Sequence, residues 1–139
     1  MRSIPQTSLW LGHRGDVRDL GAIVDAGIVA LIDLADNEPL LAISRELVYC
    51  RFPLIDGADN PAWLLEAAIG CVEQMVRLNM PTLIVCSAGM SRSPLIAAAG
   101  LARWRRCSLT ESLEVIRLTG PMDVSPGLLG EVCSHHAPS

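Results

Sequence analysis

Short apolar runs alternate with longer amphipathic segments along this chain of 139 residues. Residues 28–34 and 82–85 are nearly continuous apolar runs with many β-branched side chains, which predicts buried strands. Residues 48–54 alternate apolar and polar positions and contain two aromatic side chains, which also favours a strand. Residues 8–11 predict a further short strand that ends at Gly12.

The segments between these strands have the apolar spacing of helices. The clearest helix follows Asn60-Pro61, an N-cap residue and a proline at the first helical position, and is predicted to end near Leu78. Its apolar positions fall on one face and are expected to pack on a core: Leu64, Leu65, Ala68, Ile69, Val72 and Met75. Residues 93–105 are apolar almost all round, so we expect a largely buried helix there.

Shorter helices are predicted from their end signals. Residues 16–26 form one, a capping box at Ser108 opens another, and Ser125-Pro126 starts a short last helix. Residues 38–45 are ambiguous and fit at most one or two helical turns. Strands that alternate with helices predict an α/β fold with a mostly parallel central sheet flanked by helices.

Composition and charge narrow the class of protein. Half of the residues are hydrophobic and 19% are charged, which excludes a disordered chain and fits a single compact domain over residues 1–139. With 11 basic and 15 acidic side chains, the net charge of -4 argues against a nucleic-acid partner or a membrane surface. No segment resembles a signal peptide or a membrane span, so we expect a soluble, cytoplasmic protein.

The cysteine count adds a redox argument. Five cysteines at irregular spacing, in a chain large enough for an ordinary core, indicate reduced thiols rather than a disulfide scaffold. At least one of these thiols must therefore be judged on its reactivity.

One predicted strand–loop–helix junction carries the sequence Val85-Cys86-Ser87-Ala88-Gly89-Met90-Ser91-Arg92-Ser93. A loop of this length can turn its backbone N–H groups inward to form an anion-binding nest, and Gly89 supplies the backbone freedom that this needs. The following helix adds its N-terminal N–H groups, and the guanidinium of Arg92 can hold two oxygens of a tetrahedral oxyanion. In such surroundings a thiol pKa falls to about 3.5–7.5, so we expect Cys86 to be a nucleophile beneath a bound phosphate.

A cysteine followed six positions later by an arginine is by itself a loose pattern. Cys71 and Arg77 have the same spacing, but they lie within the strongest predicted helix with no glycine between them. We therefore expect Cys71 to pack in the core, and the loop context distinguishes Cys86 and Arg92 from this pair. The remaining cysteines are expected to be small apolar fillers: Cys50, Cys107 and Cys133.

The segment resembles the signature of the cysteine-based protein phosphatases, in particular the dual-specificity branch, which runs His-Cys-x-x-Gly-x-x-Arg-Ser/Thr. The matching positions are Cys86, Ala88, Gly89, Ser91, Arg92 and Ser93. The similarity extends over nearly the whole chain, through residues 9–12, 26–28, 32–34 and 53–56. It implies a domain of the dual-specificity phosphatase type that hydrolyses phosphotyrosine in phosphorylated proteins or peptides, with phosphoserine and phosphothreonine as further substrates, through a phosphocysteine intermediate.

The resemblance also implies roles for individual residues. Cys86 is the nucleophile, and Arg92 together with the backbone of residues 87–91 binds the phosphate. Ser93 donates a hydrogen bond that eases the departure of the thiolate in the second step.

The resemblance further implies a general acid, a carboxyl group upstream of the loop. Asp56 lies 30 residues before Cys86, at the end of a predicted strand and next to a glycine, which suits a group that swings over the pocket. The same residue could be an ordinary turn aspartate. Asp59 is the alternative acid, although it could equally help to cap the following helix.

One departure from the signature leaves a second function open. Val85 stands where the family usually has His, a residue thought to hold the loop and stabilise the thiolate. Its absence favours weakened activity, or a non-catalytic pseudophosphatase that binds phosphorylated partners. A rhodanese-like or arsenate-reducing scaffold is a further alternative, but low-molecular-weight phosphatases and arsenate reductases carry the loop near the N-terminus.

Other chemistry has less support. No Walker lysine and no cluster of acidic ligands is present, so we expect neither a metal nor another cofactor. His13 is expected in a surface loop, and His135-His136 in a frayed polar tail. Ser87 and Met90, at the variable loop positions, are neutral, which disfavours polyanionic substrates. The sequence does not predict an oligomeric state.

Overall fold

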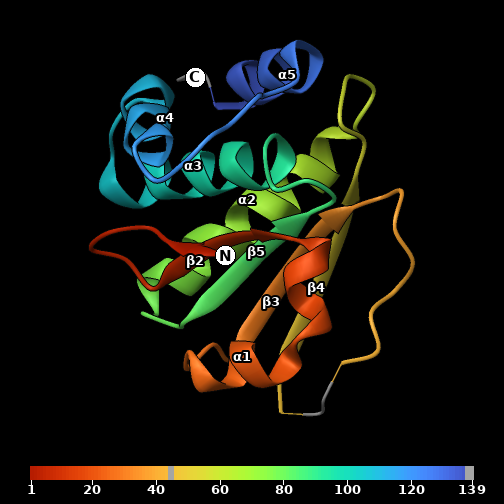
Figure 1. The fold of residues 1–139 in the computed structure, drawn as a ribbon. Coiled ribbons are helices and arrows are strands. Elements are labelled where there is room, and N and C mark those ends of the chain that lie inside the picture. The colour runs from red at the N-terminus through yellow and green to blue at the C-terminus, as the bar shows by residue number, and fades with distance from the viewer. Residues whose placement is uncertain (44–45, 137–139) are drawn as a thin grey trace.

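The computed structural model describes residues 1–43 and 46–136, whose arrangement is shown in Figure 1. Within these residues, one sheet of five strands has the order β1-β2-β5-β3-β4. The strands are β1 (Arg2–Ser3), β2 (Leu9–His13), β3 (Ala30–Ala35), β4 (Val48–Leu54) and β5 (Thr82–Cys86). β1 is antiparallel to β2, and the other neighbours are parallel, which confirms the predicted mostly parallel sheet. β1 was not predicted, because two residues are too few to show a period.

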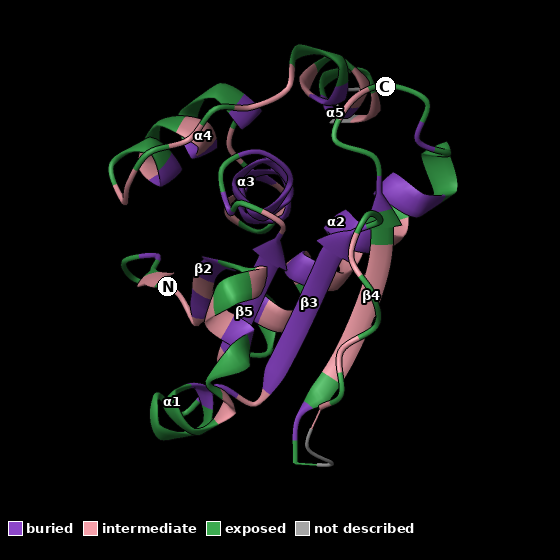
Figure 2. Cartoon of the chain, turned by 45° about the vertical axis from the view of Figure 1, so that its right-hand side comes forward, coloured by how far each residue is buried: buried purple, intermediate pink, exposed green. Residues whose placement is uncertain are grey.

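Helices cover both faces of the sheet. One face carries α2 (Ala62–Arg77), α3 (Arg92–Arg105), α4 (Leu109–Arg117) and α5 (Pro126–His136). The other face carries the 3₁₀ helix η1 (Arg14–Arg18) and α1 (Leu20–Asp25). α3 lies between the sheet and the pair α4 and α5, and its residues 92–102 are all buried, as its apolar sequence predicted (Figure 2). None of the described helices has the length and apolar character needed to span a bilayer.

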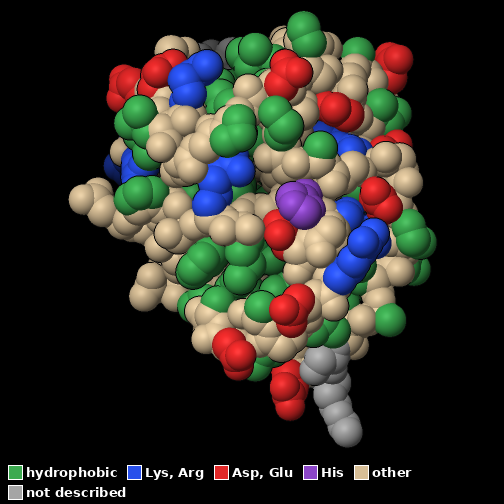
Figure 3. Space-filling model, in the orientation of Figure 1, with side chains coloured by type: hydrophobic (Ala, Val, Ile, Leu, Met, Phe, Trp, Pro, Cys, Tyr) green, Lys and Arg blue, Asp and Glu red, His purple; other side chains and the backbone are tan. Residues whose placement is uncertain are grey.

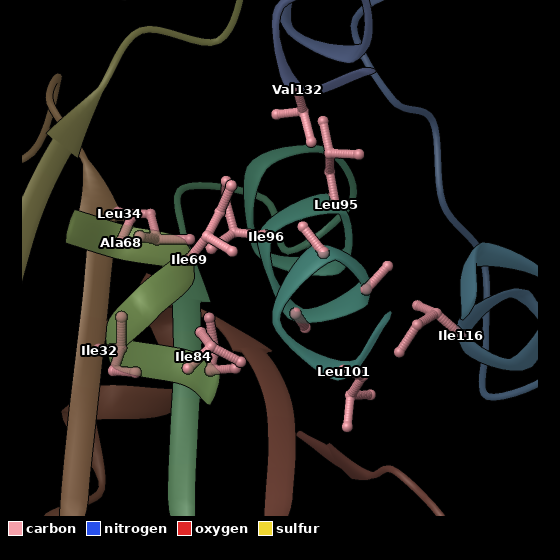
Figure 4. Packing of buried hydrophobic residues seen from close by; sticks show 14 of the residues in the cluster. Ile32, Leu34, Ala68, Ile69, Ile84, Leu95, Ile96, Leu101, Ile116 and Val132 are labelled. Atoms are coloured by element: carbon pink, nitrogen blue, oxygen red, sulfur yellow. The ribbon is translucent and has the colours of Figure 1, made fainter. Parts of the chain in front are cut away.

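Successive side chains of a strand point to opposite faces of the sheet, so each face has its own hydrophobic core. Ile32 and Ile84 belong to the cluster under α2 and α3, which also contains Ile69 and Ile96 (Figure 4). Their neighbours Leu31 and Leu83 belong to a second cluster, which lies under η1 and α1. The sheet is therefore buried on both sides at its centre, which explains the continuous apolar runs of β3 and β5.

The parallel strands end at one edge of the sheet, and the chemistry-bearing residues follow these ends. Arg14 follows β2, Asp36 follows β3, Asp56 lies just beyond β4, and Cys86 is the last residue of β5. Open parallel sheets bind their ligands at this carboxyl edge. The topology thus brings four segments that are distant in sequence to one place.

The structure divides one predicted helix and confirms the predicted cap of another. The helix predicted over 16–26 is divided at Asp19, whose carboxylate accepts a hydrogen bond from Ala22 N at 3.0 Å and so caps a new helix. The predicted cap at Ser108 is present, with its hydroxyl accepting from Glu111 N at 3.1 Å. Residues 38–43 form no helix, and residues 44–45 of the same ambiguous segment lie outside the described residues.

Asn60 does not cap α2, contrary to expectation. The helix begins at Ala62 and Pro61 is its N-cap, without a side-chain hydrogen bond. The Asn60 side chain instead accepts from Ile55 N at 2.8 Å and donates to Ile55 O and Gly57 O, both at 3.0 Å. It therefore ties together the loop that precedes the helix.

Candidate active site

The loop after β5 lies in the middle of the carboxyl edge. β5 ends at Cys86 and α3 begins at Arg92, so residues 87–91 form the connection. Cys86 is only 2% exposed, and its Sγ lies 3.3 Å from the hydroxyl of Ser93 in the first turn of α3. A buried thiol is thus held at a helix N-terminus, next to a side chain that can donate a hydrogen bond to sulfur.

Gly89 is required by the path of this loop. Its φ is +74°, and a Cβ at this position would lie 2.8 Å from the carbonyl oxygen of Gly12 in β2. Only glycine satisfies both the left-handed backbone and this close approach. Within the described part of the chain, no protein acceptor pairs with the backbone N–H groups of residues 87–91. These N–H groups are the donors from which an anion-binding nest is built.

Arg92 is buried at 4% exposure and is fixed from several sides. Its Nη1 donates to Asp36 Oδ1 at 3.0 Å and to Leu54 O at 2.8 Å. Its Nη2 donates to Asn37 Oδ1 at 3.0 Å and to Ser87 Oγ at 3.2 Å. Its Nε is buried without a hydrogen-bond partner among the described residues. The Nη1 side of the guanidinium is therefore anchored, while the Nε donor is unused.

A buried polar network fixes the segment that carries Asp36 and Asn37. Asp33 is completely buried in β3 and accepts from Arg14 Nη1 at 2.9 Å and from Tyr49 OH at 2.6 Å. Burial, followed by this hydrogen bond, raises the pKa of Tyr49. Arg14 also donates to Pro39 O at 2.6 Å, and Arg51 donates to Ala35 O and Glu38 O.

Sequence reasoning missed this network, although its signal was present. Asp33 is the single charged residue in an otherwise apolar strand, and a buried carboxylate needs partners. Arg14 and Arg51 supply the positive charges, since the Asp33 carboxylate lies 2.9 Å from Arg14 Nη1 and 4.0 Å from Arg51 Nε.

Asp56 lies beside the loop after β5. Its Oδ1 accepts from Ser91 Oγ at 2.6 Å, and the same hydroxyl oxygen accepts from Ser125 N at 2.9 Å. Ser91 therefore joins the carboxylate to the start of α5. In the structure, the loop that carries Asp56 is tied by these contacts and by those of Asn60.

Glu131 of α5 forms the outer support of this loop. Its carboxylate accepts from Asp59 N at 3.1 Å, from Asn60 N at 3.2 Å and from Asn60 Nδ2 at 3.1 Å. Asp59 itself has a φ of +74° and does not line the pocket that contains Asp56. The two aspartates considered as acids thus have different surroundings.

A pocket of about 390 Å³ contains the candidate residues. Its lining comprises Asp36, Asn37, Asp56, Cys86, Ser87, Ala88, Met90, Ser91, Arg92 and Asp123. A larger cavity of about 600 Å³ lies between the start of α2 and α5, but no cysteine or arginine lines it. The smaller pocket is the candidate active site, because it combines a thiol, a guanidinium and a carboxylate.

The other cysteines lie outside this pocket. Cys71 is half-buried against the core, and burial together with neighbouring Cys50 raises its pKa to about 12. Cys50 and Cys107 are also half-buried, whereas Cys133 is exposed and is not the expected core filler. Val85 is fully buried in the cluster on the α1 face, opposite to Cys86.

The expected frayed tail at His135 is wrong. His135 belongs to α5, and its Nε2 lies 2.6 Å from Glu66 Oε2, which also accepts from Arg103 Nη2 at 2.6 Å. These two hydrogen bonds lower the pKa of Glu66 to about 2. The side chain of His136 lies outside what the structure describes. The described residues contain no cluster of three or more His, Cys, Asp or Glu side chains suited to a metal ion.

Sequence comparison finds relatives at low identity. No family model matches the chain. Human dual specificity protein phosphatase 6 is 25% identical over 112 residues, which are 79% of this chain and 29% of that protein. Human dual specificity protein phosphatase 9 is 24% identical over the same length. The chain therefore spans less than a third of the length of these relatives.

Solved structures share the whole fold. Human DUSP28 superposes with a TM-score of 0.85 at 22% identity, covering 98% of this chain and 95% of that one. DUSP15 gives a TM-score of 0.81 at 23% identity, covering 97% and 86%. The human tyrosine phosphatase-like serine/threonine/tyrosine-interacting protein gives 0.79 at 15% identity, covering 97% and 94%. These superpositions confirm the predicted single α/β domain with helices around a mostly parallel sheet.

Proposed function

We propose that this chain, a dual-specificity-phosphatase-like member of the cysteine-based protein tyrosine phosphatase superfamily, hydrolyses phosphotyrosine in proteins or peptides, with phosphoserine and phosphothreonine as further substrates. The observation that carries this proposal is the single pocket lined by Cys86, Arg92 and Asp56. The three residues come from distant segments, yet they supply a nucleophile, an anion-binding cation and a proton donor.

In the first step, the Cys86 thiolate attacks phosphorus in line with the leaving oxygen. A sulfur–phosphorus bond forms and the phosphorus–oxygen bond to the substrate breaks. Asp56 gives its proton to the departing oxygen, so that the product leaves as a neutral phenol or alcohol. The contact between Asp56 and Ser91, at 2.6 Å, supports this assignment because it fixes the carboxyl group beside the loop.

In the second step, a water molecule attacks the phosphocysteine. Its oxygen bonds to phosphorus, the sulfur–phosphorus bond breaks, and Asp56 accepts a proton from the water. Inorganic phosphate and the Cys86 thiolate are the products. Ser93, 3.3 Å from Sγ, donates a hydrogen bond to the developing thiolate and so favours its departure.

The charge on the transferring phosphoryl group is stabilised by fixed donors. The backbone N–H groups of residues 87–91 and the Nε and Nη2 of Arg92 surround the equatorial oxygens in this proposal. Such preorganised donors in a water-poor site are usually the largest contribution to catalysis. The proposed steps use only side chains and backbone groups of this chain together with water.

The test is the release of phosphate from an aryl phosphate across pH 5 to 8. The wild type is expected to turn over, and Cys86→Ser is expected to lose this activity while still binding phosphate. A wild type that binds phosphate analogues without turnover would instead support the pseudophosphatase alternative. A wild type that neither binds nor hydrolyses them would overturn both.

A further inference from the structure

Carboxylates outnumber cations around the candidate active site. Asp36, Asp56 and Asp123 line the pocket, and Arg92 is the one Lys or Arg side chain in its described lining. Asp36 already forms an ion pair with Arg92 at 3.0 Å, and Asp56 accepts from Ser91. The positive charge of Arg92 is thus partly balanced before a substrate enters.

Asp123 is the third carboxylate of the pocket lining, beside Asp36 and Asp56. Its backbone N donates to Met90 O at 2.7 Å, which holds the residue against the phosphate-binding loop. Within the described part of the chain, its carboxylate has no hydrogen bond or ion pair. Asp123 is exposed at the pocket and can meet a substrate group that extends beyond the phosphate.

Nearby arginines do not compensate for this charge. Arg14 and Arg51 pair with buried Asp33 and donate to backbone carbonyls, and neither lines the pocket. Arg2 donates to Thr119 Oγ1 and Pro121 O. On the face of the molecule shown in Figure 3, basic and acidic side chains are interspersed, without a broad basic area.

The side of the Arg92 guanidinium away from Asp36 defines how much negative charge the pocket can take. The Nε of Arg92 is buried and unpartnered, and Nη2 faces the neutral acceptors Asn37 and Ser87. This edge can hold one phosphate. A second phosphate or a carboxylate in the same pocket would share it with Asp36 and Asp123, and like charges repel.

We propose that the pocket selects a single phosphotyrosine beside arginine or lysine side chains in a peptide, and rejects phosphotyrosine flanked by acidic groups. Asp123 is the residue that contacts the cationic neighbour of the phosphotyrosine. Met90, 37% exposed at the pocket, provides apolar contact for the same peptide. The proposal rests on the proposed function, since it names the substrate class of the same site.

The test compares three phosphotyrosine peptides of equal length, with two arginine, two alanine or two glutamate residues on either side. We expect kcat/KM to fall in that order, with about a tenfold difference between the first and last peptides at low ionic strength. Raising the salt to about 0.5 M should shrink this difference, because exposed charges are screened. A peptide with a second phosphate two residues away should behave like the glutamate peptide.

We define the charge ratio as kcat/KM for the arginine peptide divided by kcat/KM for the glutamate peptide. Asp123→Asn should reduce this ratio at least threefold. An equal loss of kcat/KM on both peptides would leave the ratio unchanged and would contradict a role of Asp123 in selectivity. Asp25→Asn is the matched control, since it removes one exposed charge in α1, far from the carboxyl edge of the sheet. Equal or better turnover of the glutamate peptide, or the same ratio in both variants, would overturn the proposal.

Binding measurements distinguish the proposed charge selectivity from the proposed phosphatase activity. Affinities of the three peptides for Cys86→Ser, measured by fluorescence anisotropy, should follow the same order without any turnover. If the wild type shows no hydrolysis but this order holds, the proposed activity falls and the charge selectivity stands. If aryl phosphate is hydrolysed and the order is absent, only the selectivity falls.

Discussion

Ser91 donates its hydroxyl hydrogen to Asp56 at 2.6 Å and thereby joins the candidate nucleophile loop to the candidate acid. The same oxygen accepts from Ser125 N, at the start of α5. The acid is thus positioned from the loop on one side and from α5, through Glu131 and Asn60, on the other. This arrangement makes it possible to test which of Asp56 and Asp59 is the general acid.

Asp56→Asn should lower turnover of substrates with poor leaving groups by about 10²–10⁴-fold, the usual contribution of a general acid. Substrates with good leaving groups, which need no proton, should be affected much less. Rate measurements on a series of aryl phosphates with different phenol pKa values test this. Asp59→Asn is the control and should change little, because Asp59 does not line the pocket. The reverse order would assign the acid to Asp59.

Glu131→Gln should also reduce kcat on poor leaving groups, by about tenfold, through the position of Asp56. The carboxylate accepts three hydrogen bonds from Asp59 and Asn60, and an amide offers a single acceptor oxygen for them. The effect should be small on good leaving groups, which identifies it as a positioning effect on the acid. Glu114→Gln, an exposed change in α4, is the control. An equal loss on all substrates would indicate general damage to the fold instead.

Gly89→Ala should abolish phosphate binding and lower the midpoint temperature of thermal unfolding. The new Cβ would lie 2.8 Å from Gly12 O, and alanine is strained at a φ of +74°. Gly70→Ala is the matched control: Gly70 lies within α2 with nothing within 4 Å of an added Cβ, so this change should stabilise by about 0.4–1 kcal/mol. Thermal unfolding with and without inorganic phosphate measures both effects. Normal binding by Gly89→Ala would show that the loop tolerates another path.

The stability of the α2–α3–α5 junction should depend on pH through Glu66. Hydrogen bonds from Arg103 and His135 lower its pKa to about 2 in the folded protein, from an ordinary 4.5. Because the folded pKa is the lower one, the contribution is present above about pH 4.5 and is lost as the pH falls towards 2. Glu66→Gln should therefore lower the unfolding midpoint in urea at pH 6 and have little effect near pH 2. A pH-independent difference would contradict this.

The sequence predicted the elements of the site better than their supports. Strong local signals placed Cys86, Gly89 and Arg92 between a strand and a helix, since burial on both faces gives β5 and α3 continuous apolar runs. The supports join residues that are distant in sequence, as in the contacts of Glu131 with Asn60. Asparagine before a proline is typical of a helix cap. Only the tertiary structure shows that the Asn60 side chain bonds to the preceding loop and to Glu131 instead.

Val85→His should not improve the enzyme, although it restores the signature residue. Val85 pairs with Asp33 across β3 and β5, and both are completely buried. An imidazole at this position would leave the apolar cluster without Val85 and compete with Arg14 and Tyr49 for the Asp33 carboxylate. Since this network holds the segment of Asp36, the variant should lose about 1–3 kcal/mol of stability without a gain in turnover. Val85→Ala is the control for the lost apolar volume alone. Urea unfolding and aryl phosphate kinetics measure both properties, and higher turnover at unchanged stability would show that valine itself limits catalysis.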